Sequence, residues 1–334
     1  MRVIIVGGTR FIGPAVVRQL LLQGHEVTVF HRGQSNDERT KDARHILGDR
    51  KDMPRFRNDF ARLRPDVALD MRAMNAAEAT LFTETFRDIV GRVVVISSID
   101  VYLAYGRLWN REPGPIEPTP LTETSPLRQT DQPLGKEFDK ISVERIVTTC
   151  PEFAATILRL PMVYGPGDRM HRLFEYLKRM DDRRPVILLD DMHARWRWIR
   201  GYVDNVAAAI CLALADRRAA GKTYNVGEQP ALTEAEWVQN IARCAGWPGE
   251  IVDMPKRFLP EHLRAEYNFE QHLDADTGRI RAELGYQEPI SREEALIRTV
   301  EWERAHPPEE IEPNDFNYGA EDAAYQEYSA SRDQ

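Results

Sequence analysis

The sequence has few cysteines, no apparent metal-ligand motif and no long apolar run. Its 334 residues include three cysteines, Cys150, Cys211 and Cys244. They are too few and too scattered for a disulfide framework, so each is expected to act as a small hydrophobic side chain. The eight histidines show no ligand spacing such as His-Glu-x-x-His, and no metal site is predicted. The longest apolar run, 206–215, is about half of the roughly 20 residues that span a bilayer, so no membrane segment is expected.

An excess of positive charge is also missing. The formal net charge is −8 and the pI is about 5.6, which argues against nucleic acid as the main partner. The N-terminus passes from a short apolar run directly into glycines, without the longer apolar stretch of a signal peptide, and a cytoplasmic location is expected. With 42% hydrophobic and 29% charged residues, the composition is that of a folded globular chain long enough for two domains.

Short apolar runs alternate with amphipathic segments in the first third of the chain. This alternation predicts an α/β protein with a Rossmann-type, doubly wound parallel sheet. Strands are predicted at 2–6, 26–30, 45–47, 67–71, 93–96, 154–160, 186–189 and 222–226. Helices are predicted at 14–23, 55–63, 76–90, 137–149, 170–180, 203–215, 234–245, 277–284 and 292–305.

The pattern suggests a dinucleotide-binding domain at 1–160, to which 203–230 returns. A smaller, mostly helical substrate-binding region would comprise 161–202 and 231–306. The segment 111–133 contains six prolines and predicts a long surface loop that could cover a site. The acidic segment 307–334 shows no periodic face and predicts a mobile or loosely docked tail.

A glycine-rich turn, Gly7 to Gly13, follows the first strand and opens the first helix. In this context glycines allow a tight turn and close helix packing, and the helix N-terminal amides receive a pyrophosphate. A tight turn without a ligand is the alternative explanation. The cofactor-binding residues predicted from the turn are Gly7, Thr9, Arg10, Phe11, Ile12 and Gly13.

The second strand ends at His31-Arg32, where an NAD site would usually place an acidic residue. Arg32, with His31 and Arg10, could instead pair with a 2′-phosphate, so NADP is favoured and NAD stays open. The alternative is that Arg32 is a solvated turn residue. Asp49, at the end of the third strand, is expected beside the adenine.

Several ordered motifs resemble the extended short-chain dehydrogenase/reductase family, which contains nucleotide-sugar epimerases and dehydratases. These motifs are Gly7–Gly13, Gly48-Asp49, Ile96–Tyr102, Leu158–Gly167, Gly201–Ala207 and Tyr224–Gly227. The resemblance implies a small-molecule substrate and a homodimer formed through the helices at 76–90 and 137–149. The glycine motif departs from typical members at Arg10, as in an atypical branch that includes chloroplast stem-loop RNA-binding proteins.

The resemblance also implies a catalytic trio of Ser or Thr, Tyr, and Lys four residues after the Tyr. Ser98 and Lys140 match the first and last members, but the tyrosine position is Lys136. Three explanations stay open. Lys136 with a lowered pKa could be the base, a relocated tyrosine could replace it, or hydride transfer has been lost. The nearest relocated candidates are Tyr102, Tyr105 and Tyr164.

Further candidates lie on the substrate side. Asp100 matches the second member of the acidic pair of family dehydratases and could remove a proton, or could cap a turn. Met162 occupies the position of a substrate-binding Asn, which puts a standard nucleotide sugar in doubt. Arg197 and Arg200 lie where the family places its diphosphate-binding arginine, and the alignment does not decide between them. Ser98 and Tyr102 complete the substrate-binding set.

The sequence therefore predicts an NADP-dependent oxidoreductase, epimerase or dehydratase acting on a hydroxylated, anionic substrate such as a sugar nucleotide. The alternative is a dinucleotide sensor or RNA-binding protein that has lost turnover.

Overall fold

A computed structural model describes residues 1–334 except 36, 134, 136 and 333–334. Its centre is a seven-stranded sheet in the order β10-β6-β5-β4-β1-β2-β3, and every pairing is parallel. The strands are β1 (Arg2–Val6), β2 (Glu26–His31), β3 (Arg44–Leu47), β4 (Val67–Asp70), β5 (Arg92–Ser98), β6 (Ala154–Leu160) and β10 (Thr223–Asn225). The predicted Rossmann-type, doubly wound α/β fold is confirmed.

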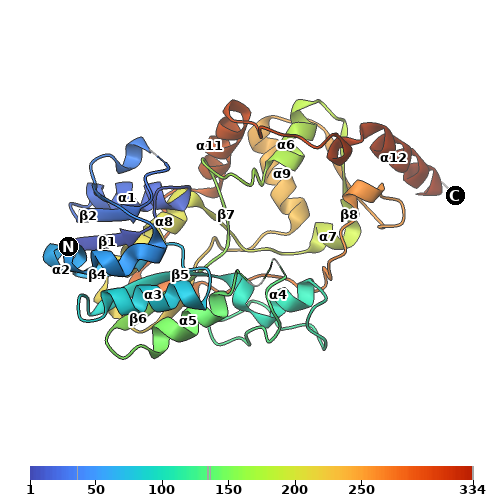
Figure 1. The fold of residues 1–334 in the computed structure, drawn as a ribbon. Helices are drawn as coiled ribbons and strands as arrows, with labels where there is room; N and C mark the ends of the chain where they lie inside the picture. The colour runs from blue at the N-terminus through green and yellow to red at the C-terminus, as the bar shows by residue number, and fades with distance from the viewer. Residues whose placement is uncertain (36, 134, 136, 333–334) are drawn as a thin grey trace.

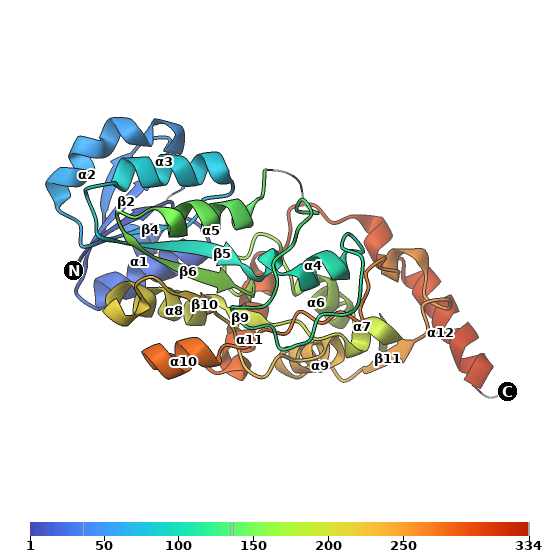
Figure 2. The same ribbon diagram turned by 90° about the horizontal axis from the view of Figure 1, so that it is seen from below.

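Alternate side chains of the buried strands supply two separate cores, one on each face of the sheet. Val3 and Ile5 face helices α1 (Ile12–Leu22) and α8 (Val203–Ala215). Ile4 and Val6 belong to the core on the other face, with helices α2 (Arg57–Leu63), α3 (Ala76–Phe86) and α5 (Lys140–Thr149). Figures 1 and 2 show these two helical layers on opposite sides of the strands. Near-continuous apolar strands are typical of a sheet buried on both faces.

The order of the strands fixes where a ligand can bind. From β1 the chain adds β2 and β3 on one side, and then crosses back to add β4, β5 and β6 on the other. Such a reversal leaves a crevice at the carboxyl ends of β1 and β4. The turn that contains the glycine motif therefore opens onto this crevice.

A second region, mostly helical, lies to one side of the sheet and is built from segments before and after β10 (Figure 1). It contains two small parallel sheets, β7 (Met162–Tyr164) with β9 (Arg200–Tyr202), and β8 (Val186–Asp190) with β11 (Glu250–Met254). Its helices are α6 (Phe174–Asp181), α7 (Asp191–Arg195), α9 (Glu234–Ala245), α11 (Arg292–Ala305) and α12 (Tyr318–Arg332). The short helices α4 (Leu103–Leu108) and α10 (Gly278–Leu284) complete the chain, and none of the described helices is long and apolar enough to cross a membrane.

The expectation of a mobile or loosely docked tail is wrong for residues 318–332, which form helix α12. Glu321 on this helix is almost fully buried and accepts a hydrogen bond of 2.7 Å from Arg179 of α6. His262 lies 3.1 Å from the same carboxylate, and Ala324 joins a small apolar cluster with β8. The buried ion pair of Glu321 and the apolar contact of Ala324 dock the helix, together with ion pairing of Asp322 with Arg184. Apolar periodicity in the sequence does not reveal such charged contacts.

Segment 111–133 forms neither helix nor strand, as predicted, but it is not purely a surface loop. Leu121 is buried and forms a bridge with Ala275. The buried Arg128 donates to the Asp100 carbonyl at 2.6 Å. The Arg128 contact holds the loop against the residues that follow β5, where the family motif places the reactive residues.

Candidate active site and cofactor crevice

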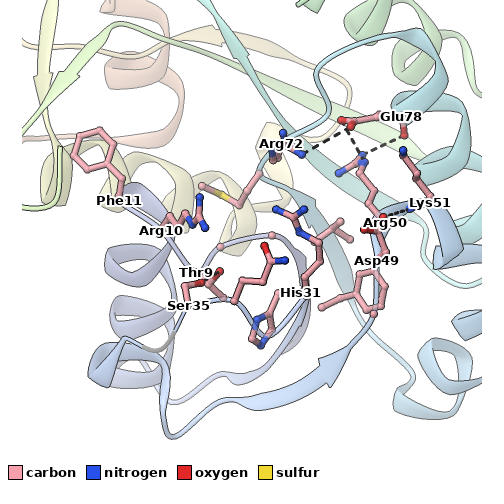
Figure 3. Close-up of a pocket in the computed structure, with 18 of the residues that line it drawn as sticks. Thr9, Arg10, Phe11, His31, Ser35, Asp49, Arg50, Lys51, Arg72 and Glu78 are labelled. Atoms are coloured by element: carbon pink, nitrogen blue, oxygen red, sulfur yellow. Dashed lines mark hydrogen bonds and ion pairs between the residues drawn. The ribbon is translucent and has the colours of Figure 1, made fainter. Parts of the chain in front are cut away.

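A crevice of about 460 Å³ opens at the carboxyl ends of β1, β2, β3 and β4. Its volume lies within the range of about 300–1,000 Å³ that is typical of ligand sites. Figure 3 shows Thr9 and Arg10 of the glycine turn facing it from one side and Asp49, Arg50 and Lys51 from the other. Of the predicted cofactor residues, those that line it are Gly7, Thr9, Arg10, Phe11, Ile12, His31, Arg32 and Asp49.

The glycine turn has the geometry that a diphosphate requires. Gly7 and Gly8 have φ values of +90° and +83°, a region that side chains rarely adopt. A Cβ atom on Gly13 would lie 2.3 Å from the Gly8 Cα, so only glycine allows α1 to approach the turn this closely. Among the described residues no side chain caps the N-terminus of α1. The Gly13 amide donates to the Arg10 carbonyl at 3.0 Å and Pro14 has no amide hydrogen. The amides at this end that can meet an anion are therefore those of Phe11 and Ile12, and the residues present fit a dinucleotide.

Arg10 and Arg32 are both available to a ligand. Neither guanidinium has a hydrogen-bond or ion-pair partner among the residues that the structure describes, although both arginines line the crevice. Arg32 is exposed and lies on the turn directly after β2. The acidic residues that line the crevice, Asp49 and Glu78, come from the segment after β3 and from α3. A free guanidinium at this point matches a phosphate better than a ribose hydroxyl.

His31 is already hydrogen-bonded within the protein. Its Nδ1 accepts from the Gly33 amide at 3.2 Å, and its Nε2 lies 2.8 Å from His45 Nδ1. His45 in turn uses Nε2 to donate to the Thr40 carbonyl at 2.9 Å. Partial burial, with the neighbouring His45 as a smaller cause, lowers the pKa of His31. His31 therefore lines the crevice as a hydrogen-bonded ring whose lowered pKa disfavours a positive charge.

The end of the crevice beside β3, where the adenine is expected, is shaped by a small aromatic group. A Cβ on Gly48 would lie within 2.7 Å of both Phe30 and Phe56, whose ring centroids are 5.1 Å apart. A glycine at position 48 therefore lets the backbone leave β3 in close contact with both rings. Asp49 caps the next turn by accepting from the Lys51 amide at 2.9 Å, and its carboxylate lines the crevice.

Several crevice residues lay outside the sequence prediction: Gln34, Ser35, Arg50, Lys51, Met71, Arg72 and Glu78. The Ser35 hydroxyl donates to the Thr9 hydroxyl at 2.7 Å, which joins the loop after β2 to the glycine turn. Met71 and Arg72 directly follow β4. Because parallel strands end at one edge of the sheet, the end of β4 was a signal that could have found this pair.

The predicted reactive residues Ser98, Asp100 and Lys140 meet at the carboxyl end of β5. Ser98 Oγ accepts from the Asp100 amide at 3.3 Å. Lys140, on the first turn of α5, donates from Nζ to the carbonyl of Ile96 at 3.1 Å. Burial raises the pKa of Asp100 and lowers that of Lys140 to about 8, and each charge attracts the other.

Lys136, the residue at the family's tyrosine position, lies outside the described residues. Two of the three alternative tyrosines are bound internally. The buried Tyr102 hydroxyl donates to Asn225 at 2.6 Å and accepts from Arg159 at 3.0 Å, whereas the Tyr164 hydroxyl donates to Glu228 at 3.0 Å. Burial raises the pKa of both. Tyr105 lies near Asp100, whose charge together with burial raises the tyrosine pKa.

The substrate-side candidates lie in the second region. Met162 on β7 is paired with Arg200 on β9, and both are buried. The Arg200 guanidinium forms an ion pair with the buried Glu234. Arg197 is about 40% exposed, donates to the Ala231 carbonyl at 2.7 Å and lies 3.5 Å from Glu236. Of the two arginines, Arg197 is the one with an accessible guanidinium.

The sheet, the glycine turn and the residues at the end of β5 together define a dinucleotide-dependent enzyme of the short-chain dehydrogenase/reductase type. Residues 3–227 match the model of the NAD dependent epimerase/dehydratase family. The chain belongs to this family.

Individual relatives agree with the assignment. The chain is 29% identical over 274 residues to 2′-dehydrokanamycin reductase of Streptomyces kanamyceticus, covering 79% of this chain and 72% of the relative. It is 24% identical over 316 residues to chloroplast stem-loop binding protein of 41 kDa b of Arabidopsis thaliana, covering 88% and 77%. A UDP-glucose-4-epimerase structure from Stenotrophomonas maltophila with bound NAD shares the fold, with a TM-score of 0.71, 18% identity and coverage of 91% and 98%.

Proposed function

We propose that this enzyme uses NADP to oxidise, reduce or epimerise a hydroxylated, anionic substrate such as a sugar nucleotide. The observation that supports NADP is the free guanidinium of Arg32 at the end of β2, with Arg10 facing the same crevice. A cofactor bound along the glycine turn would supply a hydride acceptor or donor beside β5. The likeness to 2′-dehydrokanamycin reductase and to a dTDP-glucose 4,6-dehydratase supports chemistry of this class.

The proposed roles follow from position. Lys140 holds the ribose next to the reacting carbon, and Ser98 donates a hydrogen bond to the substrate oxygen. Asp100 is the candidate for removing a proton from carbon. Lys136 moves the hydroxyl proton, with Tyr105 as the alternative because its neighbour Asp100 lies at the reactive end.

For the substrate, we propose that Arg197 contacts the anionic group, since Arg200 is buried with Glu234. Met162 offers no hydrogen-bond donor, so a nucleoside diphosphate would be held differently from that of typical members. We further propose that the protein acts in the cytoplasm as a homodimer formed through α3 and α5. Partly buried apolar side chains on these helices, Leu81 and Ile146, support this surface.

The test of the cofactor proposal is a calorimetric titration with NADPH and NADH, using the wild-type protein and Arg32→Ser. Loss of a charge-assisted phosphate contact costs about 1.5–3 kcal/mol, so Arg32→Ser should weaken NADPH binding about 10- to 150-fold and change NADH binding less than about twofold. Arg62→Ser removes an exposed arginine from α2 and is the matched control. Equal losses for both cofactors would contradict the proposal.

Turnover is tested separately, by following NADPH oxidation with a panel of keto-sugar nucleotides. Lys136→Tyr should abolish a native activity if Lys136 moves the proton, and would create activity if the site had lapsed. Tight NADPH binding without turnover on any keto compound would instead favour the sensor alternative, which the likeness to the stem-loop binding protein supports.

A further inference from the structure

The ammonium of Lys140 is almost fully buried and is held by two backbone carbonyls. Nζ donates to Ala73 at 2.6 Å and to Ile96 at 3.1 Å. Ile96 belongs to β5, whereas Ala73 lies in the turn that follows β4. An ammonium has three donors. The two carbonyls therefore fix its position and leave one N–H for a ligand.

The turn that presents the Ala73 carbonyl is itself organised by Asp70, the last residue of β4. The Asp70 carboxylate has no solvent exposure and accepts from the amides of Arg72 and Ala73, both at 2.9 Å. The Asp70 carboxylate therefore determines the direction of the Ala73 peptide. No sequence motif singled out Asp70.

Asp70 is held in turn by Arg50, from the 3₁₀ segment that follows β3. The guanidinium forms a two-pronged ion pair with the Asp70 carboxylate, one contact being 2.8 Å from Nη1 to Oδ1. Arg50 also donates to the Glu78 carbonyl at 3.1 Å and lies 3.5 Å from the Glu78 carboxylate (Figure 3). This arrangement links the adenine side of the crevice to Lys140 through consecutive contacts.

The charges around Lys140 oppose one another. Burial is the largest effect and lowers its pKa to about 8, while the charges of Asp70, Glu78 and Asp100 raise it and that of Arg50 lowers it further. Asp70 is the largest of the three acidic effects. Removing the Asp70 charge should therefore lower the pKa of Lys140, whereas removing the Arg50 charge should raise it.

We propose that Asp70, clamped by Arg50, is a positioning residue for Lys140: it orients the Ala73 carbonyl toward the ammonium and supplies the negative charge that keeps this ammonium protonated. The use of the remaining N–H for a ribose hydroxyl rests on the proposed function. The contacts among Arg50, Asp70, Ala73 and Lys140 are independent of that function.

The test is an NMR titration of the whole protein with ¹³C at the lysine ε-carbon. The chain has seven lysines, and Lys140→Arg identifies the Lys140 signal by its loss. In the wild type we expect a midpoint near pH 8. Asp70→Asn should lower this midpoint, and Arg50→Gln should raise it, each by about 1 pH unit.

Asp66→Asn is the matched control, because Asp66 lies at the opposite end of β4, about 13 Å away, and contacts Arg2 at the surface. It should leave the midpoint unchanged. If Asp70→Asn does not fold, Glu78→Gln lowers the midpoint in the same direction by a smaller amount, and Arg50→Gln still tests the opposite sign. The proposal would be overturned if Asp70→Asn and Arg50→Gln moved the Lys140 midpoint in the same direction, or if neither variant moved it.

Failure of this proposal is distinguishable from failure of the proposed function. The lysine titration is read without cofactor, whereas the function depends on NADPH binding. A normal pattern of shifts in a protein that binds neither nicotinamide cofactor would leave the Asp70 proposal standing and remove the cofactor proposal.

Discussion

Burial of Lys140 makes the stability of the fold depend on pH in a predictable direction. Its pKa falls from an ordinary 10.5 to about 8 in the folded protein. Between these values the unfolded chain binds a proton that the folded chain does not, so stability rises with pH across this window and is flat below it. At 1.36 kcal/mol per pH unit, the wild type should gain about 3 kcal/mol relative to Lys140→Met between pH 8 and 10.5.

The assay is urea unfolding of both proteins at half-unit steps from pH 7 to 9.5. Subtracting the variant removes every titration that the two proteins share. Between pH 8 and 9.5, the free energy of unfolding of the wild type minus that of Lys140→Met should increase by roughly 2 kcal/mol. Lys41→Met, at an exposed lysine paired with Glu38, is the control and should give a nearly flat difference over this range. A Lys140 difference that is flat, or that falls with pH, would refute the burial argument.

Three further predictions concern other parts of the molecule. Gly13→Ala places a methyl group 2.3 Å from the Gly8 Cα, so calorimetry should show at least a 100-fold loss of NADPH affinity; unchanged binding would contradict the geometry of the turn. Glu321→Gln leaves Arg179 buried without its charged partner and should lower stability by about 3–5 kcal/mol in urea unfolding, with faster proteolysis of α12; an unchanged midpoint would show that the helix docks by other contacts. Tyr102→Phe removes a hydroxyl that is fully bonded inside the protein, so it should lower the melting temperature without changing NADPH affinity; a selective loss of cofactor binding would place that hydroxyl in the site instead.

The core of the fold could be read from the sequence because each buried strand is a nearly continuous apolar run bounded by polar residues. β1 and β6 begin and end where the pattern predicts, and α8, α9 and α11 match their predicted bounds. Helix ends were less accurate where tertiary contacts decide them. The helix predicted at 170–180 begins only at Phe174, because the preceding loop takes a left-handed turn at His171 that also brings this ring within 2.7 Å of Glu303.

The glycine turn between β1 and α1 could be predicted because glycine has few other reasons to recur at that spacing. The ion pair between charged residues on the far side of the crevice could not be predicted from the sequence. Arg50 and Asp70 are 20 residues apart and meet only because β3 and β4 end at the same edge of one sheet. The same limit applies to Arg197 and Arg200, whose motif was visible but whose pairing with Glu236 and Glu234 depends on the placement of α9.

A crystal structure of the protein grown with NADPH tests the central claim most directly. The account predicts diphosphate oxygens within hydrogen-bond distance of the amides that begin α1, and the 2′-phosphate beside Arg32. Electron density for NADPH elsewhere, or its adenosine bound with the 2′-phosphate turned away from Arg32, would contradict it.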